Sequence, residues 1–131
     1  MPDYCNAVII PNVTEASGYF PIIDDMVTPI GHINILKGGR LTIERSGTLF
    51  IDGFYMFHNG ITNSGKLFNY GNLTIMNVGA TCVENNESLF VNCGHVILDT
   101  SIEEAFDSDF STIFVNISEI QTDESLVFLK L

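Results

Sequence analysis

The chain has 131 residues, of which 46% are hydrophobic, so it is long enough to form one domain with a packed core. Its formal net charge of −11 argues against binding to a nucleic-acid backbone, which requires clustered Lys and Arg side chains. No apolar run in the sequence approaches the roughly 20 residues of a transmembrane helix, and membrane insertion is therefore not expected.

The N-terminal segment, residues 1–38, contains all four prolines and none of the repeats described below. We expect an extended arm with short strands, for example over 7–10 and 19–23, because proline confines a strand to edges or irregular pairing. No secretory (Sec) signal peptide is visible in this segment, since it lacks a basic region followed by a long apolar one. Cys5 lies in the expected arm and is the candidate for a disulfide between chains.

The central segment, residues 39–98, repeats a short phrase in which glycine, or once serine, precedes alternating apolar and polar residues. The phrases begin at Gly39, Gly47, Gly60, Gly65, Gly71, Ser88 and Gly94. The alternation predicts short β-strands, and the Gly and Asn residues between them predict turns. A period this short is typical of a solenoid, in which each coil covers the apolar edge of the next. Three strands per coil predict roughly 18–23 residues per turn and about three coils.

Asparagine recurs at the ends of these phrases, as at Asn63, Asn69 and Asn92. Asn tolerates turn conformations, and Asn side chains at equivalent corners of successive coils can stack into hydrogen-bonded ladders. We therefore interpret these residues as structural rather than catalytic.

The C-terminal segment, residues 99–131, leaves the repeat and opens with an acidic stretch. We expect one helical turn over 102–106 and two strands, over 112–117 and 126–131. The second strand is strongly apolar and must be covered by the fold or by a neighbouring molecule. The three segments together are expected to form one structural domain.

The sequence contains no convincing site for chemistry. The spacing of Cys82, Cys93 and His95 matches no zinc knuckle, and the acidic stretch lacks the ordered ligands of a calcium loop. Asp52 and His58 are not accompanied by the sequence motif of an activated serine. We expect no catalytic residue, no cofactor and no metal site, and we predict that the protein is not an enzyme.

Residues 59–75, Asn-Gly-Ile-Thr-Asn-Ser-Gly-Lys-Leu-Phe-Asn-Tyr-Gly-Asn-Leu-Thr-Ile, resemble the repeats of filamentous haemagglutinin-like adhesins and related right-handed parallel β-helices. This resemblance implies an all-β fold, a short parallel β-helix or β-solenoid. The alternative is a β-sandwich or jelly roll built from the same strands, because strand pairing is not visible in a sequence.

A short solenoid presents unpaired strand edges at both ends, and subunits can add to one another at such edges. We therefore expect a self-assembling structural protein, a homo-oligomer or filament whose main partner is another copy of the chain. Expected locations are the extracellular surface, as a filament subunit, or a virion, as a structural component of the virion or of a phage tail. The expected assembly residues are Cys5, Val8, Ile9, Ile10, Leu126, Val127, Phe128, Leu129 and Leu131.

Two alternative functions remain open at the level of sequence. One is a non-catalytic, adhesin-like module that binds a glycan or protein on a host surface, with Tyr55, Phe57, Phe68 and Tyr70 as its platform. The other is an acidic DNA mimic that inhibits a DNA-binding protein, as the net charge of −11 suggests.

Overall fold

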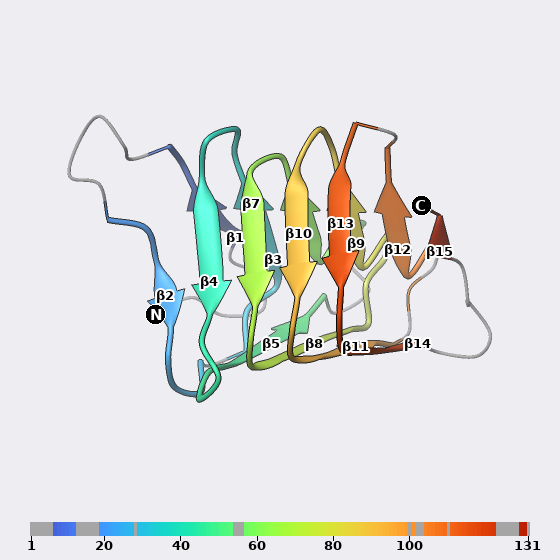
Figure 1. The fold of residues 1–131 in the computed structure, drawn as a ribbon. Coiled ribbons are helices and arrows are strands. Elements are labelled where there is room, and N and C mark those ends of the chain that lie inside the picture. The colour runs from blue at the N-terminus through green and yellow to red at the C-terminus, as the bar shows by residue number, and fades with distance from the viewer. Residues whose placement is uncertain are drawn as a thin grey trace.

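A computed structural model of the chain describes residues 7–12, 19–27, 29–53, 57–99, 101, 104–109, 111–122 and 129–130. Every regular element in these residues is a β-strand, and the strands stack as a parallel β-solenoid of about four turns (Figure 1). The predicted fold class is confirmed, and the β-sandwich alternative is wrong because all strand pairs in the described residues are parallel.

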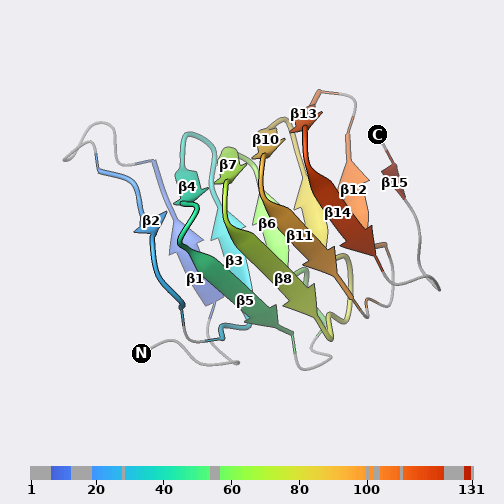
Figure 2. The ribbon, with the colours of Figure 1, turned by 60° about the horizontal axis from the view of Figure 1, so that its bottom comes forward.

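Three sheets form the sides of the stack. Sheet A has six strands in the order β1 (Ala7–Ile10), β3 (His32–Ile35), β6 (Ile61–Asn63), β9 (Val83–Asn85), β12 (Phe106–Ser108) and β15 (Leu129–Lys130). Sheet B has five, β2 (Ile22–Ile23), β4 (Arg40–Ile43), β7 (Lys66–Asn69), β10 (Leu89–Asn92) and β13 (Ile113–Asn116). Sheet C has four, β5 (Thr48–Asp52), β8 (Asn72–Met76), β11 (His95–Leu98) and β14 (Glu119–Thr122), and it lies foremost in Figure 2.

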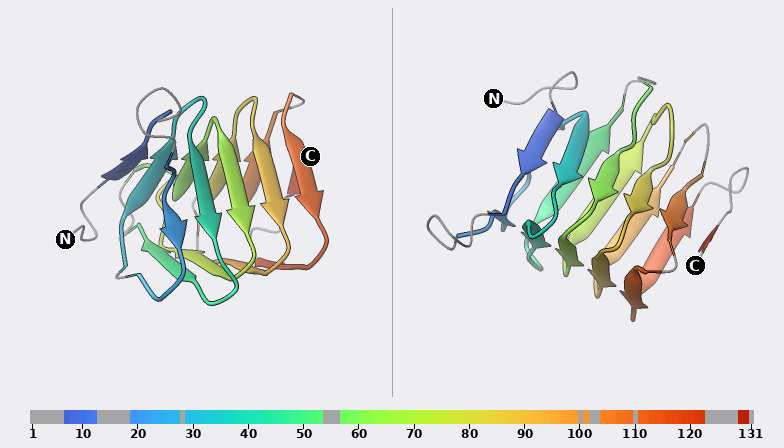
Figure 3. Two further views of the ribbon diagram at one scale, coloured as in Figure 1. Left: turned by 60° about the vertical axis from the view of Figure 1, so that its left-hand side comes forward. Right: turned by 90° about the horizontal axis from the view of Figure 1, so that it is seen from above.

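The strand register gives the length of each turn. Asn69 pairs with Asn92, which in turn pairs with Asn116, and these pairs, with the contact between Asn63 and Asn85, give turns of about 22–24 residues. The turn from β3 to β6, in which Ile33 pairs with Ile61, is longer, and the turn from β2 to β4, in which Ile22 pairs with Thr42, is shorter. The expected turn of roughly 18–23 residues is therefore slightly too short. Figure 3 shows the strands of successive turns lying side by side from two further directions.

The core fills the triangular interior of the stack. Each strand of a full turn alternates inward and outward side chains, as in β4, where Leu41 and Ile43 are buried while Arg40 is exposed. Along sheet B, Leu41 pairs with Leu67, which pairs with Phe90, so that one column of large apolar side chains runs through the turns. Such columns are what the alternating phrases predict, because a period of two places every second side chain on the same face.

Asparagine ladders line two corners of the interior. Asn69 Nδ2 donates to Asn92 Oδ1 at 2.9 Å, and Asn92 Nδ2 donates to Asn116 Oδ1 at 3.0 Å. At the other corner, Asn63 Nδ2 donates to Asn85 Oδ1 at 2.9 Å. These amides also bind backbone locally; Asn69 Oδ1, for example, accepts from the N–H of the glycine two residues later at 3.2 Å. The predicted structural role of these asparagines is confirmed.

Two expectations are corrected by the structure. The solenoid has about four turns instead of about three, because strands outside residues 39–98, such as β3 and β12, also belong to the stack. The helical turn expected over 102–106 is wrong where it can be compared, since Phe106 begins strand β12 and pairs with Val83. Phe106 is fully buried between Phe90 and Phe114, and this aromatic packing favours the extended conformation.

Candidate assembly surfaces

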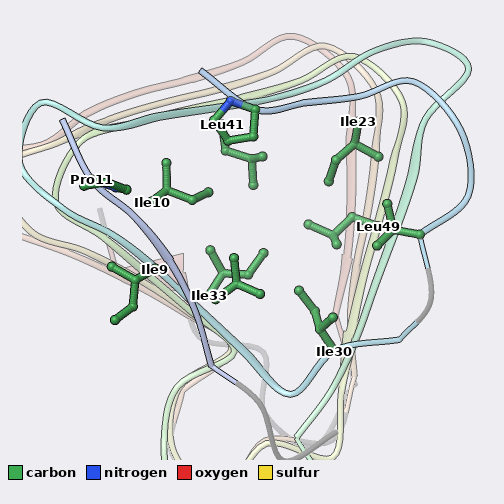
Figure 4. A pocket seen from close by; sticks show the side chains of 11 residues that line it. Ile9, Ile10, Pro11, Ile23, Ile30, Ile33, Leu41 and Leu49 are labelled. Atoms are coloured by element: carbon green, nitrogen blue, oxygen red, sulfur yellow. The ribbon is translucent and has the colours of Figure 1, made fainter. Parts of the chain in front are cut away.

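The N-terminal end of the stack contains an apolar cavity of about 400 Å³. Its lining is aliphatic, and in Figure 4 the side chains of strands β1 to β5 and of the segment before β3 point into the triangular interior. The residues that do so include Ile10, Ile23, Ile30, Ile33, Leu41 and Leu49. The other residues of the wall are Val8, Ile9, Pro11, Pro21 and Val27. Among the described residues, the stack is therefore open to an apolar cavity at this end.

Strand β1 offers a backbone edge at this end. The N–H of Leu36 donates to the carbonyl of Ile10 at 2.9 Å, which turns the backbone groups of Ile10 towards β3. Because hydrogen-bonding direction alternates along a strand, the N–H and carbonyl of Ile9 face away from β3. The Ile9 side chain is 60% exposed on the outer face of sheet A. Among the described residues, no other strand pairs with β1 on this side.

At the opposite end, β13, β14 and β15 are the last described strands of their sheets. Strands β12, β13 and β14 belong to one turn, and sheets B and C end at that turn in the described residues. Sheet A continues for one more strand, because β15 pairs with β12 on its far side. The inward side chains Phe114 and Ile120 are only partly buried and pack against the core. Both ends of the described stack therefore combine strand edges with apolar side chains.

The outer face of sheet B carries an apolar surface that runs across three strands. Phe68 of β7 pairs in register with Val91 of β10, and Val91 pairs with Val115 of β13. The turns after these strands add a second row, because each begins with an outward side chain. The surface, called the sheet B patch below, consists of Phe68, Tyr70, Val91, Cys93, Val115 and Ile117.

Exposure makes the sheet B patch unusual for a solvent-facing sheet. Ile117 is 73% exposed, and the neighbouring Ile113 on β13 is 63% exposed. The rings of Phe68 and Tyr70 lie nearly parallel, with centroids 6.5 Å apart. Contiguous apolar surfaces of this kind mark interaction sites more often than isolated exposed side chains do. In Figure 1 the strands that carry the patch face the viewer.

Charged residues border the patch on the side of β4. Arg40 and Lys66 are aligned in register on the outer face, and the Arg40 guanidinium lies 5.0 Å from the centre of the Phe20 ring. Glu44 follows β4 as Tyr70 follows β7. The N–H of Glu44 donates to the carbonyl of Ile23 on β2, and the N–H of Tyr70 donates to the carbonyl of Ile43 on β4, so the two residues occupy equivalent positions in successive turns. The outer face of sheet B is therefore charged on β4 and apolar on β10 and β13.

A polar cluster lies beside sheet A. The carbonyl of Asn59 accepts hydrogen bonds from Nδ1 of His32, at 2.7 Å, and from Nδ1 of His58, at 3.0 Å. The Asn59 side chain donates to Thr62 Oγ1 at 3.0 Å and also to Glu84 Oε2. Burial lowers the pKa of His32, and the nearby His58 lowers it further. The two imidazole rings, 5.1 Å apart, are thus held by one carbonyl.

No cluster of three or more His, Cys, Asp or Glu side chains that could hold a metal ion is present in the described part of the chain. Cys82 is buried, and burial raises the pKa of its thiol to about 11, so the thiolate nucleophile is strongly disfavoured. Cys93 is partly exposed and free. The described residues also include no helix of the length and hydrophobicity needed to cross a membrane.

The residues that the sequence singled out for assembly fall in different places. Ile9 is exposed, Val8 lines the end cavity, and Ile10 is buried in the core of its own chain. Leu129 begins β15, which pairs with β12. The remaining candidates lie outside the described residues: Cys5, Leu126, Val127, Phe128 and Leu131.

The aromatic platform suggested by the sequence is not one surface. Phe68 and Tyr70 stack on sheet B, whereas Phe57 is exposed in the turn before strand β6 of sheet A. Tyr55 lies outside the described residues. The sequence did not indicate the aliphatic members of the sheet B patch, because only the strand register places them beside Phe68. They recur once per turn, and this spacing is a signal that can be recognised once the length of a turn is known.

The fold places the chain among parallel β-solenoids. Comparisons with protein-family models, with curated proteins and with solved structures return no match.

Proposed function

We propose that the chain is a self-assembling structural protein that adds end to end by β-strand addition, as the subunit of an extracellular filament or of a virion or phage tail. The resemblance of residues 59–75 to filamentous haemagglutinin-like repeats supports a fibre or surface role. The observation that carries the proposal is the edge of β1, where the backbone of Ile9 faces away from β3 beside an exposed apolar side chain. Edges of this kind are templates for pairing with another chain.

Sheet A is the natural place for this addition. Its last described strand, β15, extends one strand beyond sheets B and C, and its first strand is β1. A second copy that pairs its β1 with β15 continues a parallel sheet with the same strand direction. Head-to-tail contacts that do not close into a ring generate a filament, and we expect this outcome because the copies add along the axis of the stack.

The proposal is tested by a pair of substitutions at one position. Ile9→Pro removes the N–H that faces the open edge, whereas Ile9→Thr keeps it with a side chain that is also β-branched. We expect concentration-dependent filaments of the wild type and of Ile9→Thr in negative-stain electron microscopy and sedimentation, and none of Ile9→Pro. Circular dichroism verifies that each variant is folded. Uniform small particles of the wild type at every concentration would refute end-to-end assembly.

A second candidate is the non-catalytic binding module, which the parallel rings of Phe68 and Tyr70 favour. Paired aromatic rings on an exposed sheet can stack against the apolar face of a sugar. Binding of the wild type, but not of Tyr70→Ala, to immobilised glycans would support this function. Equal binding of the two proteins would argue against it.

A further inference from the structure

The outer face of sheet B has the layout of a self-complementary interface. Its middle row, in register, runs from Ile22 of β2 through Thr42 of β4, Phe68 of β7 and Val91 of β10 to Val115 of β13. The rows on either side repeat the same order, polar or charged on β4 and apolar on β10 and β13. The first row runs from Arg40 through Lys66 and Leu89 to Ile113.

We propose that this face packs against the same face of a second copy, about a two-fold axis that runs along the stack. In that arrangement each strand lies opposite its own equivalent, so the apolar strands β10 and β13 meet apolar strands. The middle row meets itself, and the first row meets the third. A two-fold axis across the stack, centred between β7 and β10, would instead place the apolar β13 opposite the charged β4, and it would bury Ile113 against Arg40.

Charge supports the same axis. Arg40 lies in the first row and Glu44 in the third, at opposite ends of the same strand, so within one chain they are about 13 Å apart. Rotation about the axis along the stack brings Arg40 of each copy opposite Glu44 of the other, which makes two complementary contacts at the rim. Lys66 likewise comes opposite Tyr70, whose ring face can accept a cation. Rim charges of this kind fix the orientation of an interface with an apolar centre.

The surface is separate from the strand edges of the proposed function, so lateral pairing and end-to-end growth can be measured independently. The mass of the particle is measured by analytical ultracentrifugation in the Ile9→Pro background, in which filaments are not expected. We expect a dimer in that background. The matched variants are Val91→Lys in the patch on β10 and Ile97→Lys on the outer face of β11, where Ile97 is also partly exposed.

Val91→Lys is expected to raise the dimer dissociation constant about 30-fold or more, because it places a charge at the centre of an apolar contact. Ile97→Lys should leave the dissociation constant unchanged. A monomer at all concentrations, or an equal effect of the two substitutions, would overturn the proposal. Capture of a different protein by the patch, without a dimer, would also overturn it.

Charge exchange tests the position of the axis. Arg40→Glu and Glu44→Arg are each expected to weaken the dimer, since each brings like charges together, and the double variant should restore it. Within one chain these residues do not meet, so such a rescue requires contact between copies. Failure of the double variant to recover the dimer would exclude this axis.

Cross-linking provides a second measurement of the axis that does not depend on affinity. Val115→Cys is placed in a Cys5→Ser, Cys93→Ser background, where the buried Cys82 is unreactive towards maleimides. Packed sheets are about 10 Å apart, so the two introduced cysteines should be joined by a short bis-maleimide. For an axis across the stack between β7 and β10 their separation would be about 17 Å, because three strand spacings are added, and no cross-link would form.

Discussion

At the scale of single residues, the structure shows how a small number of polar side chains are accommodated in a narrow core. Asn69 is fully buried, yet its amide donates to Asn92 Oδ1 and to the carbonyl of His95, at 3.0 Å, and its oxygen accepts from the N–H of Gly71. On its other side, Asn69 pairs with the buried Ile43, which has no side-chain donor or acceptor. The ladder can begin beside this apolar residue because each amide donates towards the next turn. A buried polar group satisfied in this way avoids the cost of desolvation.

His32 leads to a prediction about pH. Burial lowers the pKa of its imidazole in the folded state, so the unfolded chain binds more protons than the folded chain just below the ordinary pKa of about 6.5. Stability should therefore be complete above this pH and decrease as the pH falls below it. His58 and, through Asn59, Glu84 are the titratable groups beside the ring.

Urea denaturation at pH 7.5, 6.5 and 5.5 measures this effect. His32→Asn should reduce the loss of stability between pH 6.5 and 5.5, because an asparagine has no proton to gain in this range. His95→Asn, at an exposed position on β11, is the matched control and should retain the wild-type pH dependence. An identical pH dependence of wild type and His32→Asn would contradict the prediction.

At the scale of elements, the composition of the turns between strands determines which strands can be predicted from the sequence. The strands that follow a Gly phrase are predicted correctly, as with β4, β5, β7 and β8. Gly94 shows why the phrase is informative, since a Cβ there would collide with the carbonyl oxygen of Gly71 one turn below. The close stacking of turns thus requires glycine at that corner, and the requirement is visible in the sequence.

Strands without this requirement are predicted less well: β1 and β13 are found where they are expected, over 7–10 and within 112–117, but others escape prediction. β9 and β12 are preceded by turns of other composition, and β3 alternates clearly but lies in the proline-rich segment. The turn before β10 is one residue longer than the turn before β7. It accommodates the extra residue because Glu87 adopts a positive φ of 46°, and the N–H of Glu87 donates to Asp109 Oδ2 at 3.1 Å. Contacts of this kind join residues a whole turn apart, and no local pattern indicates them. The sheet B patch escapes prediction for the same reason.

Loss of the ladder between β7, β10 and β13 should destabilise the fold. Asn92→Ala removes the acceptor of Asn69 Nδ2 and of the Gly94 N–H and leaves a small cavity. We expect a decrease of about 2–3 kcal/mol in the free energy of unfolding, measured by urea denaturation. Asn116→Ala is the control, because Asn116 is exposed at the end of the same ladder and its loss should cost about 1 kcal/mol or less. A loss of about 1 kcal/mol or less for Asn92→Ala as well would show that the ladder contributes little.

At the scale of the whole molecule, the proposed assembly has to overcome repulsion between copies. Each copy has a net charge of −11, with acidic residues on the later turns, and only five Lys and Arg residues to offset them. Strand addition by contrast gains short-range hydrogen bonds and apolar contacts, which salt screens much less than it screens charges. The balance between these terms should set the concentration at which filaments form.

Ionic strength therefore provides the last prediction. Raising NaCl from about 10 mM to about 150 mM shortens the screening length from about 30 Å to about 8 Å, which is less than the width of a small domain. The critical concentration for filament formation, measured by sedimentation and light scattering, should fall as salt rises. Ile9→Pro should remain free of filaments at either salt concentration, because screening cannot replace the missing edge donor. A critical concentration that rises with salt would mean that attraction between opposite charges, instead of pairing of strand edges, holds the copies together.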